Sequence, residues 1–277
     1  MATTGRLLNK LFSLESEIAV VTGALGKLGS VWIEALLEAG ASVFALDLPG
    51  AGVAKEFQRL EDRFDESRLM LRRTDVRDRP ALESVCEQCM ESFGVPSILV
   101  NNAGIDRPPA NAGISHHLED IPLEENRAIL EVNTLGLFLT SQVFGKCMLR
   151  AGRGSIINIG SLYAGVSPDV RFYDHIQSDA PFLKPPAYGA SKAAVVNLTR
   201  YLATHWAPRG VRVNALSPGG VLGGQDEQFR DKFCHRVPMG RMAVSDDLCG
   251  PLLFLASRAS SYVTGTELVV DGGFTAW

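Results

Sequence analysis

Short apolar runs alternate along the chain with stretches of amphipathic character. Residues 18–22 and 42–46 are almost continuously apolar, which is typical of strands buried on both faces of a parallel sheet. After the first run, apolar residues recur at helical spacing: Val31, Trp32, Ala35, Leu36 and Leu37. Strand and helix signals alternate in this way from residue 18 to residue 270. The pattern predicts an α/β protein with a doubly wound parallel sheet of about seven strands and helices on both faces.

The composition is that of a globular protein with a large core. The chain has 277 residues, of which 46% are hydrophobic, enough for one large domain or two smaller ones. No linker, charge block or internal repeat divides it, so we expect a single domain over residues 1–277, with residues 1–17 as an N-terminal extension. A net charge of -4 with interspersed signs argues against nucleic acid or a membrane surface as a partner. The extension lacks an apolar signal core, and no stretch approaches the roughly 20 apolar residues of a membrane span, which predicts a cytoplasmic protein.

A glycine-rich turn follows the first apolar run directly. Residues 23–29 read Gly-Ala-Leu-Gly-Lys-Leu-Gly and precede the first helical pattern. Glycines there let the backbone approach a pyrophosphate, whose charge is met by free N–H groups at the start of the helix. The second run ends in Asp47, whose carboxylate can bind an adenosine ribose diol and would repel a 2′-phosphate. Since the adjacent Leu48 offers no cation, the segment predicts NAD as the cofactor in preference to NADP.

Tyr188 and Lys192 are four positions apart in an apolar run that predicts a helix, and Ser161 ends an apolar run upstream of them. Positions i and i+4 share one face of a helix, so the Lys192 ammonium can lie beside the Tyr188 phenol and favour its ionised form. A tyrosine beside such a charge can exchange a proton with a substrate hydroxyl near neutral pH. The pair taken alone has a second interpretation, an ordinary helix surface.

Further motifs follow in order along the chain. They are Asp75-Val76, Asn101-Asn102-Ala103-Gly104, Asn133, Pro218-Gly219, Val263-Thr264-Gly265 and Asp271-Gly272-Gly273. With the glycine turn, Ser161, Tyr188 and Lys192, they resemble the short-chain dehydrogenase/reductase family over nearly the whole chain. The resemblance implies a Rossmann-type fold, an enzyme that acts on CH–OH groups, and a homo-oligomer, either a tetramer or a dimer.

The resemblance also implies a role for each of these residues. Tyr188 would be the general base in alcohol oxidation and the general acid in carbonyl reduction, with Lys192 lowering its pKa and binding the nicotinamide ribose. Ser161 would hold and polarise the substrate oxygen, and Asn133 would hold a water that links the lysine to solvent. Ser161 and Asn133 also have structural interpretations, as a strand terminator and as part of a helix kink. The implied cofactor site consists of Gly23, Leu25, Gly26, Lys27, Leu28, Asp47, Leu48, Asp75, Val76, Asn102, Ala103, Gly104, Tyr188, Lys192, Pro218, Gly219 and Val221.

Two positions depart from the usual family pattern. Compact members carry a glycine at the position of Lys27, and here that glycine has moved to Gly26, as in the family's longer branch that handles sugar nucleotides. The threonine often found two positions after Val221 is replaced by Gly223. One usual cofactor contact is therefore missing or replaced.

The histidines and cysteines do not predict a metal site. The five histidines are adjacent or isolated rather than spaced as a zinc or iron site requires. Cys86 and Cys89 form a Cys-x-x-Cys without a second pair, which favours packed thiols over zinc or redox chemistry. Five cysteines, an odd number, suit a reducing compartment.

The segment between the serine and the tyrosine, residues 162–187, is longer than the family usually has. A solvated surface loop is one interpretation; the other is a wall of the substrate pocket, because catalytic residues anchor both of its ends. The polarity of the expected pocket favours a sugar, polyol or sugar acid over a sterol or long acyl chain. The expected pocket residues are Ser161, Asp106, Arg107, Arg171 and His175, with Lys184 beside them.

The long segment, the shifted glycine and a polar helix predicted over residues 225–236 look like bacterial family members that act on sugars, in particular oxidoreductases of flagellin-modification and nonulosonic-acid pathways. We therefore predict NAD-dependent hydride exchange at a secondary hydroxyl or ketone of a small sugar-like substrate. Two alternatives stay open. One is reduction of a 3-oxoacyl group with NADPH, against which Asp47 argues. The other is a catalytically silent dinucleotide-binding regulator, against which Ser161, Tyr188 and Lys192 argue.

Overall fold

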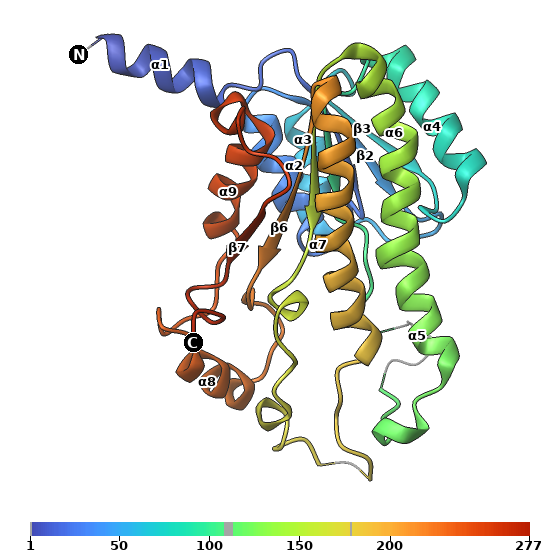
Figure 1. Cartoon of the computed structure of the whole chain (residues 1–277), viewed down its shortest axis with the longest axis vertical. Coiled ribbons are helices and arrows are strands. Elements are labelled where there is room, and N and C mark those ends of the chain that lie inside the picture. Colours follow the sequence, from blue (N-terminus) through green and yellow to red (C-terminus); the bar gives the residue numbers. More distant parts are fainter. Residues whose placement is uncertain (1, 108–112, 178) are drawn as a thin grey trace.

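A seven-stranded parallel sheet forms the centre of the protein (Figure 1). The computed structural model describes residues 2–107, 113–177 and 179–277. Each pair of neighbouring strands is parallel, and the spatial order is β3-β2-β1-β4-β5-β6-β7. This arrangement confirms the predicted doubly wound α/β fold. The strands are β1 (Ile18–Thr22), β2 (Ser42–Asp47), β3 (Leu69–Arg73), β4 (Ile98–Asn101), β5 (Gly154–Ile159), β6 (Val211–Pro218) and β7 (Glu267–Val270).

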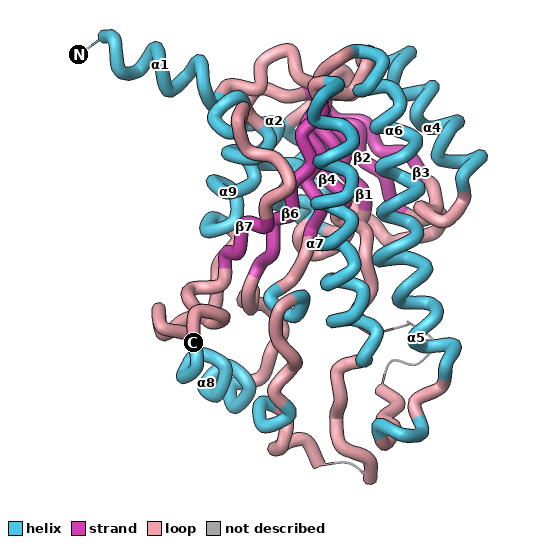
Figure 2. The backbone as a smooth tube through the Cα atoms, viewed as in Figure 1, coloured by secondary structure: helices cyan, strands magenta, loops and turns pink. Residues whose placement is uncertain are grey.

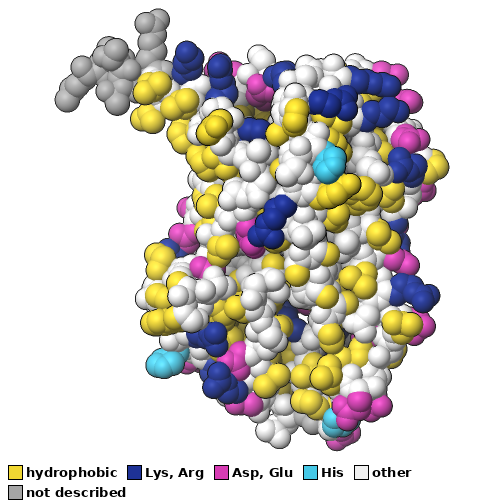
Figure 3. All heavy atoms as spheres, viewed as in Figure 1, with side chains coloured by type: hydrophobic (Ala, Val, Ile, Leu, Met, Phe, Trp, Pro, Cys, Tyr) yellow, Lys and Arg dark blue, Asp and Glu magenta, His cyan; other side chains and the backbone are white. Residues whose placement is uncertain are grey.

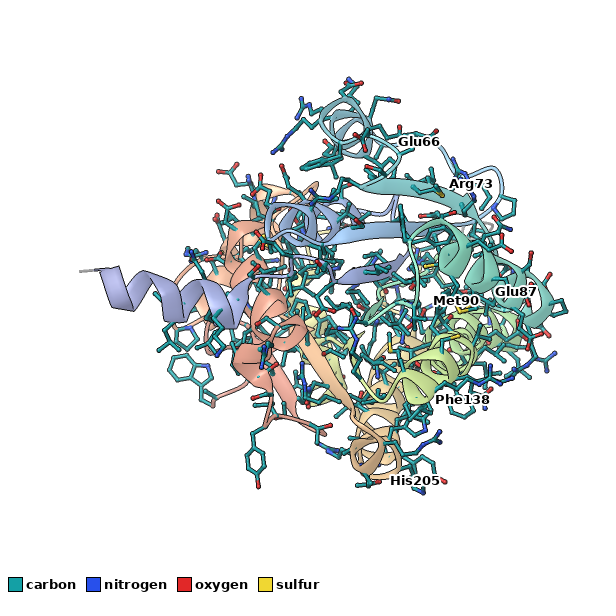
Figure 4. All side chains as sticks on the ribbon, turned by 90° about the horizontal axis from the view of Figure 1, so that it is seen from above. Glu66, Arg73, Glu87, Met90, Phe138 and His205 are labelled. Atoms are coloured by element: carbon teal, nitrogen blue, oxygen red, sulfur yellow. The ribbon has the colours of Figure 1, made fainter. Side chains whose placement is uncertain are left out.

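Helices cover both faces of the sheet (Figure 2). On one face lie α2 (Gly29–Glu38), α3 (Lys55–Arg63) and α9 (Asp246–Ala256); on the other lie α4 (Arg79–Ser92), α6 (Leu137–Ala151) and α7 (Pro186–Trp206). Successive strand residues point to opposite faces, so Val21 of β1 packs in the first layer while Val20 packs in the second. Met90 of α4 and Phe138 of α6 pack against the core of the second layer (Figure 4). Both faces of the sheet are therefore apolar, which explains the continuously apolar strand sequences.

A continuous helical run leads from α5 (Leu123–Leu130) through a π-helical segment, Glu131–Gly136, into α6. The whole run is long and apolar enough to cross a membrane by length and composition alone. Half of its most apolar stretch is buried, however, and Phe144 of α6 packs against the sheet, as in a core helix. Asn133 lies in the π-helical segment, which agrees with its interpretation as part of a helix irregularity.

Loops and α8 (Glu227–Arg236) extend beyond the carboxyl ends of the strands, at the lower end of Figure 1. Segment 162–187 belongs to this region and contains short 3-10 turns. It buries Phe172 in a third apolar core, together with Phe233 of α8 and Phe274 near the C-terminus. The described part of the segment is thus anchored in the protein at Phe172, while other side chains of the segment, such as Val170, are exposed.

The outer surface carries charges of both signs. Figure 3 shows basic and acidic side chains intermixed over the visible face, without a continuous area of one sign. α1 (Ala2–Phe12) projects from the end of the molecule that lies opposite the loops and α8 (Figure 1). Leu14, just after α1, is buried in the core, so the N-terminal extension joins the domain there.

Candidate active site

A cleft of about 730 Å³ opens at the carboxyl ends of the central strands. In the sheet, β1 and β4 are neighbours, and the helices that follow them, α2 and α6, lie on opposite faces. The two connections therefore diverge at this point, which is where parallel α/β sheets bind ligands. Every residue predicted for cofactor binding lines this cleft, from Gly23 in the glycine turn to Val221 after β6. The structure thus brings all of the predicted cofactor-binding residues together. That they bind a cofactor stays a prediction.

Close contacts fix the shape of the glycine turn. Gly23 has a φ of 63°, and a Cβ there would lie 2.8 Å from the Ala103 Cα, so only glycine fits. The Asn102 Nδ2 donates hydrogen bonds to the carbonyl oxygens of Thr22 and Gly23, at 3.0 and 2.9 Å. The Trp32 indole N–H in turn donates to the Asn102 Oδ1 at 2.8 Å. The residue after β4 and a side chain of α2 therefore hold the turn from two sides.

The Asp47 carboxylate ends β2 and faces the glycine turn. Its Oδ2 accepts a hydrogen bond from the Leu25 N–H at 2.7 Å, so the acid and the turn are fixed together. Arg73 is in register with Asp47 on β3, and its guanidinium donates to backbone carbonyl oxygens after β2. Arg77 lines the cleft and forms an ion pair with Asp75 at 2.6 Å. Both arginines near this end of the cleft are thus already engaged by the protein.

Tyr188, Ser161 and Lys192 meet where this cleft joins a second pocket. Tyr188 and Lys192 come from α7, and Ser161 follows β5. The Lys192 side chain is buried, and its Nζ donates to the Ile159 carbonyl oxygen at 2.8 Å and lies 5.8 Å from the centre of the Tyr188 ring. The Ser161 hydroxyl lies near the Tyr188 hydroxyl and acts to lower its pKa. One substrate oxygen can therefore contact both Ser161 and Tyr188.

Asn133 is buried beside this group and binds protein atoms with its amide. Its Oδ1 accepts a hydrogen bond from the Ile105 N–H at 2.8 Å. Its Nδ2 donates to the Ile105 carbonyl oxygen at 2.9 Å and to the Ser191 Oγ at 3.0 Å. Asn133 therefore ties the segment after β4 to α7, and its predicted role in holding a water stays a prediction.

Burial has the largest effect on the pKa values of Tyr188 and Lys192. It raises the pKa of Tyr188 to about 12; the Asp106 carboxylate adds to this effect, and the Ser161 hydroxyl acts in the opposite direction. Burial lowers the pKa of Lys192 to about 8. The net shift of Tyr188 is thus opposite to the one expected from sequence, and a lowering of its pKa by Lys192 stays a prediction. Tyr188 is therefore a protonated phenol near neutral pH.

The second pocket has a volume of about 400 Å³ and adjoins the cleft at Ser161 and Tyr188. Segment 162–187, α8 and the residues between β6 and α8 form its walls. Within the described part of the chain, Lys184 is the one cation in its lining, with the Nζ 5.2 Å from the centre of the Tyr188 ring. The pocket can hold a small molecule with an apolar face and a polar or anionic end. Aromatic rings predominate in its walls: Tyr163, Tyr173, Phe182, Phe229 and Phe233.

The structure brings only part of the predicted substrate site to this pocket. Ser161 lines it, and Asp106 lines the adjoining cleft, where it forms an ion pair with Lys184. Arg107 does not line the pocket. Its guanidinium donates to the carbonyl oxygens of Ile114 and Leu183, at 3.1 and 3.0 Å, and so braces the surrounding loops.

Arg171 and His175 also lie outside the lining of this pocket, where the sequence placed them, and their contact with a substrate stays a prediction. The Arg171 guanidinium pairs with the Asp169 carboxylate at 2.6 Å, and its side chain is 78% exposed on the outer surface. The His175 Nε2 lies 2.9 Å from the Asp226 carboxylate, where segment 162–187 meets the start of α8. His175 therefore contacts Asp226, which lines the pocket, whereas Arg171 is paired on the outer surface.

Sequence reasoning missed the aromatic lining of the pocket and Gln225, which lines both the pocket and the cleft. The Tyr173 ring packs on Phe182 and Phe229, with ring centres 4.7 and 5.2 Å apart. The number of aromatic residues in segment 162–187 was an available signal. Their direction was not, because it depends on packing against α8.

Comparison with known proteins agrees with this geometry. The family model described as enoyl-(acyl carrier protein) reductase matches residues 23–275. The chain is 34% identical to a galactitol 2-dehydrogenase (L-tagatose-forming) of Cereibacter sphaeroides, over 96% of this chain and 98% of that protein. It is similar to the structure of a gluconate 5-dehydrogenase from Burkholderia cenocepacia J2315 in complex with NADP and tartrate (30% identity, 98% of this chain and 99% of that chain, TM-score 0.83). A short-chain dehydrogenase from Leptospira borgpetersenii serovar Hardjo-bovis with bound NAD+ is also similar (32% identity, 94% and 93%, TM-score 0.80).

Proposed function

Because the chain belongs to the short-chain dehydrogenase/reductase family and is an oxidoreductase acting on CH–OH groups, we propose that it transfers a hydride between NAD and a secondary hydroxyl or ketone of a sugar, polyol or sugar acid. The observation that carries the proposal is the meeting of Ser161 and Tyr188 at the boundary between a long cleft and a small pocket. A cytoplasmic location and a homo-oligomeric assembly, either a tetramer or a dimer, complete the proposal.

The residues of the cleft fit a nicotinamide dinucleotide. At Gly23 the backbone forms the surface of the cleft without a side chain, and α2 begins close by at Gly29, where the positive end of the helix dipole favours a pyrophosphate. Asp47 would bind the adenosine ribose, and Lys192 the nicotinamide ribose. When bound, the nicotinamide supplies the hydride acceptor or donor.

Proton transfer is assigned to Tyr188. In carbonyl reduction, the Tyr188 hydroxyl donates its proton to the substrate oxygen, while the Ser161 hydroxyl holds that oxygen by a second hydrogen bond. In alcohol oxidation, the ionised Tyr188 oxygen accepts the hydroxyl proton and Ser161 keeps the substrate in place. The raised pKa of Tyr188 suits proton donation more than proton acceptance near neutral pH.

The pocket supports a small molecule with hydroxyl groups and exposed C–H faces. The Tyr173 and Phe229 rings can pack against C–H groups, while Gln225 and Lys184 can bind hydroxyl or carboxylate oxygens. The relatives named for galactitol and for gluconate take substrates of this kind, a neutral polyol and a sugar acid. Both classes therefore belong to the proposal.

One observation favours a second candidate, reduction of a 3-oxoacyl or other carbonyl group with NADPH. The pocket is more aromatic than the sequence predicts, which suits a less polar substrate. Asp47 at the ribose end of the cleft argues against NADPH. A silent dinucleotide-binding regulator is disfavoured because Ser161, Tyr188 and Lys192 are all in place around the pocket.

Turnover of a substrate panel tests the proposal. The purified chain is mixed with NAD and, separately, with galactitol, threitol, glucitol and gluconate, and NADH formation is followed by absorbance. An acetoacetyl thioester is offered in parallel with NADPH. The proposal expects NADH formation with at least one member of the panel. Turnover of the thioester alone would support the second candidate, and cofactor binding without any turnover would support the regulator.

NADH is expected to be the better cofactor. The parent protein should show about tenfold or greater kcat/KM with NADH than with NADPH, because the Asp47 carboxylate would repel the 2′-phosphate. Asp47→Ser keeps a hydrogen-bonding group without the charge and should reduce this ratio. Initial rates with both cofactors measure it. A parent ratio in favour of NADPH would mean that cations such as Lys27 or Arg77 set the preference.

The two directions of the reaction are expected to differ in their pH dependence. Oxidation needs ionised Tyr188, whose pKa is raised to about 12. Its kcat/KM should therefore rise about tenfold per pH unit between about pH 6 and about pH 9, whereas that of reduction, which needs the phenol, should stay level. Initial rates in both directions at constant ionic strength measure the two profiles. A level oxidation profile over this range would mean that the site lowers the pKa, as expected from sequence.

A further inference from the structure

Lys27 crosses the cleft from the glycine turn to the segment after β6. Its Nζ donates to the Val221 carbonyl oxygen at 2.9 Å, a contact between residues 194 positions apart. The same oxygen accepts a hydrogen bond from the Gln225 Nε2 at 2.9 Å. Since Gln225 lines the substrate pocket as well as the cleft, one carbonyl oxygen joins a lysine on the cofactor side to a glutamine on the substrate side.

Gly223 leaves the space that this contact needs. A Cβ at position 223 would lie 2.3 Å from the Lys27 Nζ and 2.9 Å from its Cε, so any side chain there would displace the ammonium. The Gly223 N–H donates to the Gln225 Oε1 at 2.7 Å, which keeps the segment in this conformation. Positions 27 and 223, the two departures from the usual family pattern, therefore touch each other in space.

The Lys27 ammonium is free to bind an anion. Among the residues that the structure describes, no carboxylate forms an ion pair with it, and desolvation alone shifts its pKa, downward. The Val221 carbonyl uses one of its three N–H donors. Its side chain starts in the glycine turn, close to the start of α2 at Gly29, where helix N–H groups also favour negative charge. The two other donors are therefore left for an anion in the cleft between the turn and Val221. A diphosphate is the anion that such a turn accommodates.

We propose that Lys27 binds the pyrophosphate of the dinucleotide while it keeps its bond to Val221, and so fastens a wall of the substrate pocket to the bound cofactor. The proposal rests on the proposed function and adds a physical link between cofactor binding and the pocket. Gly223 is the positioning residue that allows this link. Because Lys27 lies near the surface, loss of its charge should weaken cofactor binding about fivefold rather than a hundredfold.

Isothermal titration with NADH and with ADP-ribose tests the link. Lys27→Met keeps the unbranched apolar part of the side chain without the ammonium, and should raise both Kd values about fivefold and make them less dependent on salt. Gly223→Ala should raise them to a similar extent in the parent and leave them unchanged in the Lys27→Met background. Lys146→Met, which removes an exposed lysine on α6, is the control and should bind like the parent.

Two results would overturn the link between Lys27 and the cofactor. One is parent-like Kd values for Lys27→Met; the other is a Gly223→Ala effect of the same size in both backgrounds. Lys27→Gln is the substitute if Lys27→Met melts at a lower temperature than the parent. If the parent protein binds NADH and the Lys27 variants bind it with the same Kd, this inference fails and the proposed function stands. If the parent binds neither NADH nor NADPH, the proposed function fails with it.

Discussion

Tyr188→Phe is expected to lower kcat by about a thousandfold, while the Kd for NADH stays within about twofold of the parent value. Phenylalanine keeps the ring, which packs edge-on against Tyr163 with ring centres 6.4 Å apart, but removes the hydroxyl that carries the proton. The rate of NADH formation gives kcat, and titration gives the Kd. The combination separates loss of chemistry from loss of cofactor binding.

Tyr201→Phe is the matched control for this prediction. Tyr201 lies on the same helix as Tyr188, but its side chain is exposed and does not line the cleft or the pocket. The control should have parent-like kinetics. Turnover by Tyr188→Phe within about tenfold of the parent would contradict the assignment of Tyr188 as the proton donor and acceptor.

Lys184→Met should lower kcat/KM for gluconate roughly ten- to hundredfold, because a lost hydrogen bond to a charged group is worth about 1.5 to 3 kcal/mol. Lys184 is the cation of the pocket lining and lies beside Tyr188; it pairs with Asp106 and has two further N–H donors for a substrate carboxylate. Methionine keeps only the apolar part of the side chain. The effect should be smaller for glucitol, which has the same carbon chain without the carboxylate. Steady-state kinetics on both compounds measure the difference, and the Kd for NADH should not change.

Arg171→Ala is the control for Lys184→Met. Arg171 also belongs to segment 162–187, but its guanidinium pairs with Asp169 on the outer surface. Its replacement should change the activation free energy by less than about 0.5 kcal/mol. If Arg171→Ala has the larger effect on gluconate oxidation, Arg171 rather than Lys184 contacts the substrate, and the pocket described above is not the substrate site.

The cofactor side of the site is predictable from the sequence because its residues adjoin the ends of regular strands. Apolar runs mark β1 and β2, and the carboxyl ends of parallel strands share one edge of the sheet. Gly23 and Asp47 are therefore placed together without any knowledge of side-chain packing. Helical spacing on α7 likewise places Tyr188 and Lys192 on one face.

The substrate side is less predictable because segment 162–187 has no regular periodicity. Its side-chain directions follow from packing with distant residues, such as that of Phe172 against Phe233 of α8. Arg171, expected in the pocket, instead finds the carboxylate of Asp169 two positions away. The direction of the Tyr188 pKa shift was missed for a similar reason, since it depends on burial that no spacing reveals.

Transfer of deuterium from substrate carbon to the nicotinamide tests the central claim most directly. The polyol or sugar acid that the panel shows to be oxidised fastest is prepared with deuterium on its carbon atoms and incubated with NAD and the parent protein. Mass spectrometry then measures the NADH that is formed. The proposed function predicts NADH that carries one deuterium, formed about a thousandfold more slowly by Tyr188→Phe. Hydride transfer at this site would be contradicted by NADH that carries no deuterium. It would also be contradicted if the parent protein binds NAD and forms no NADH.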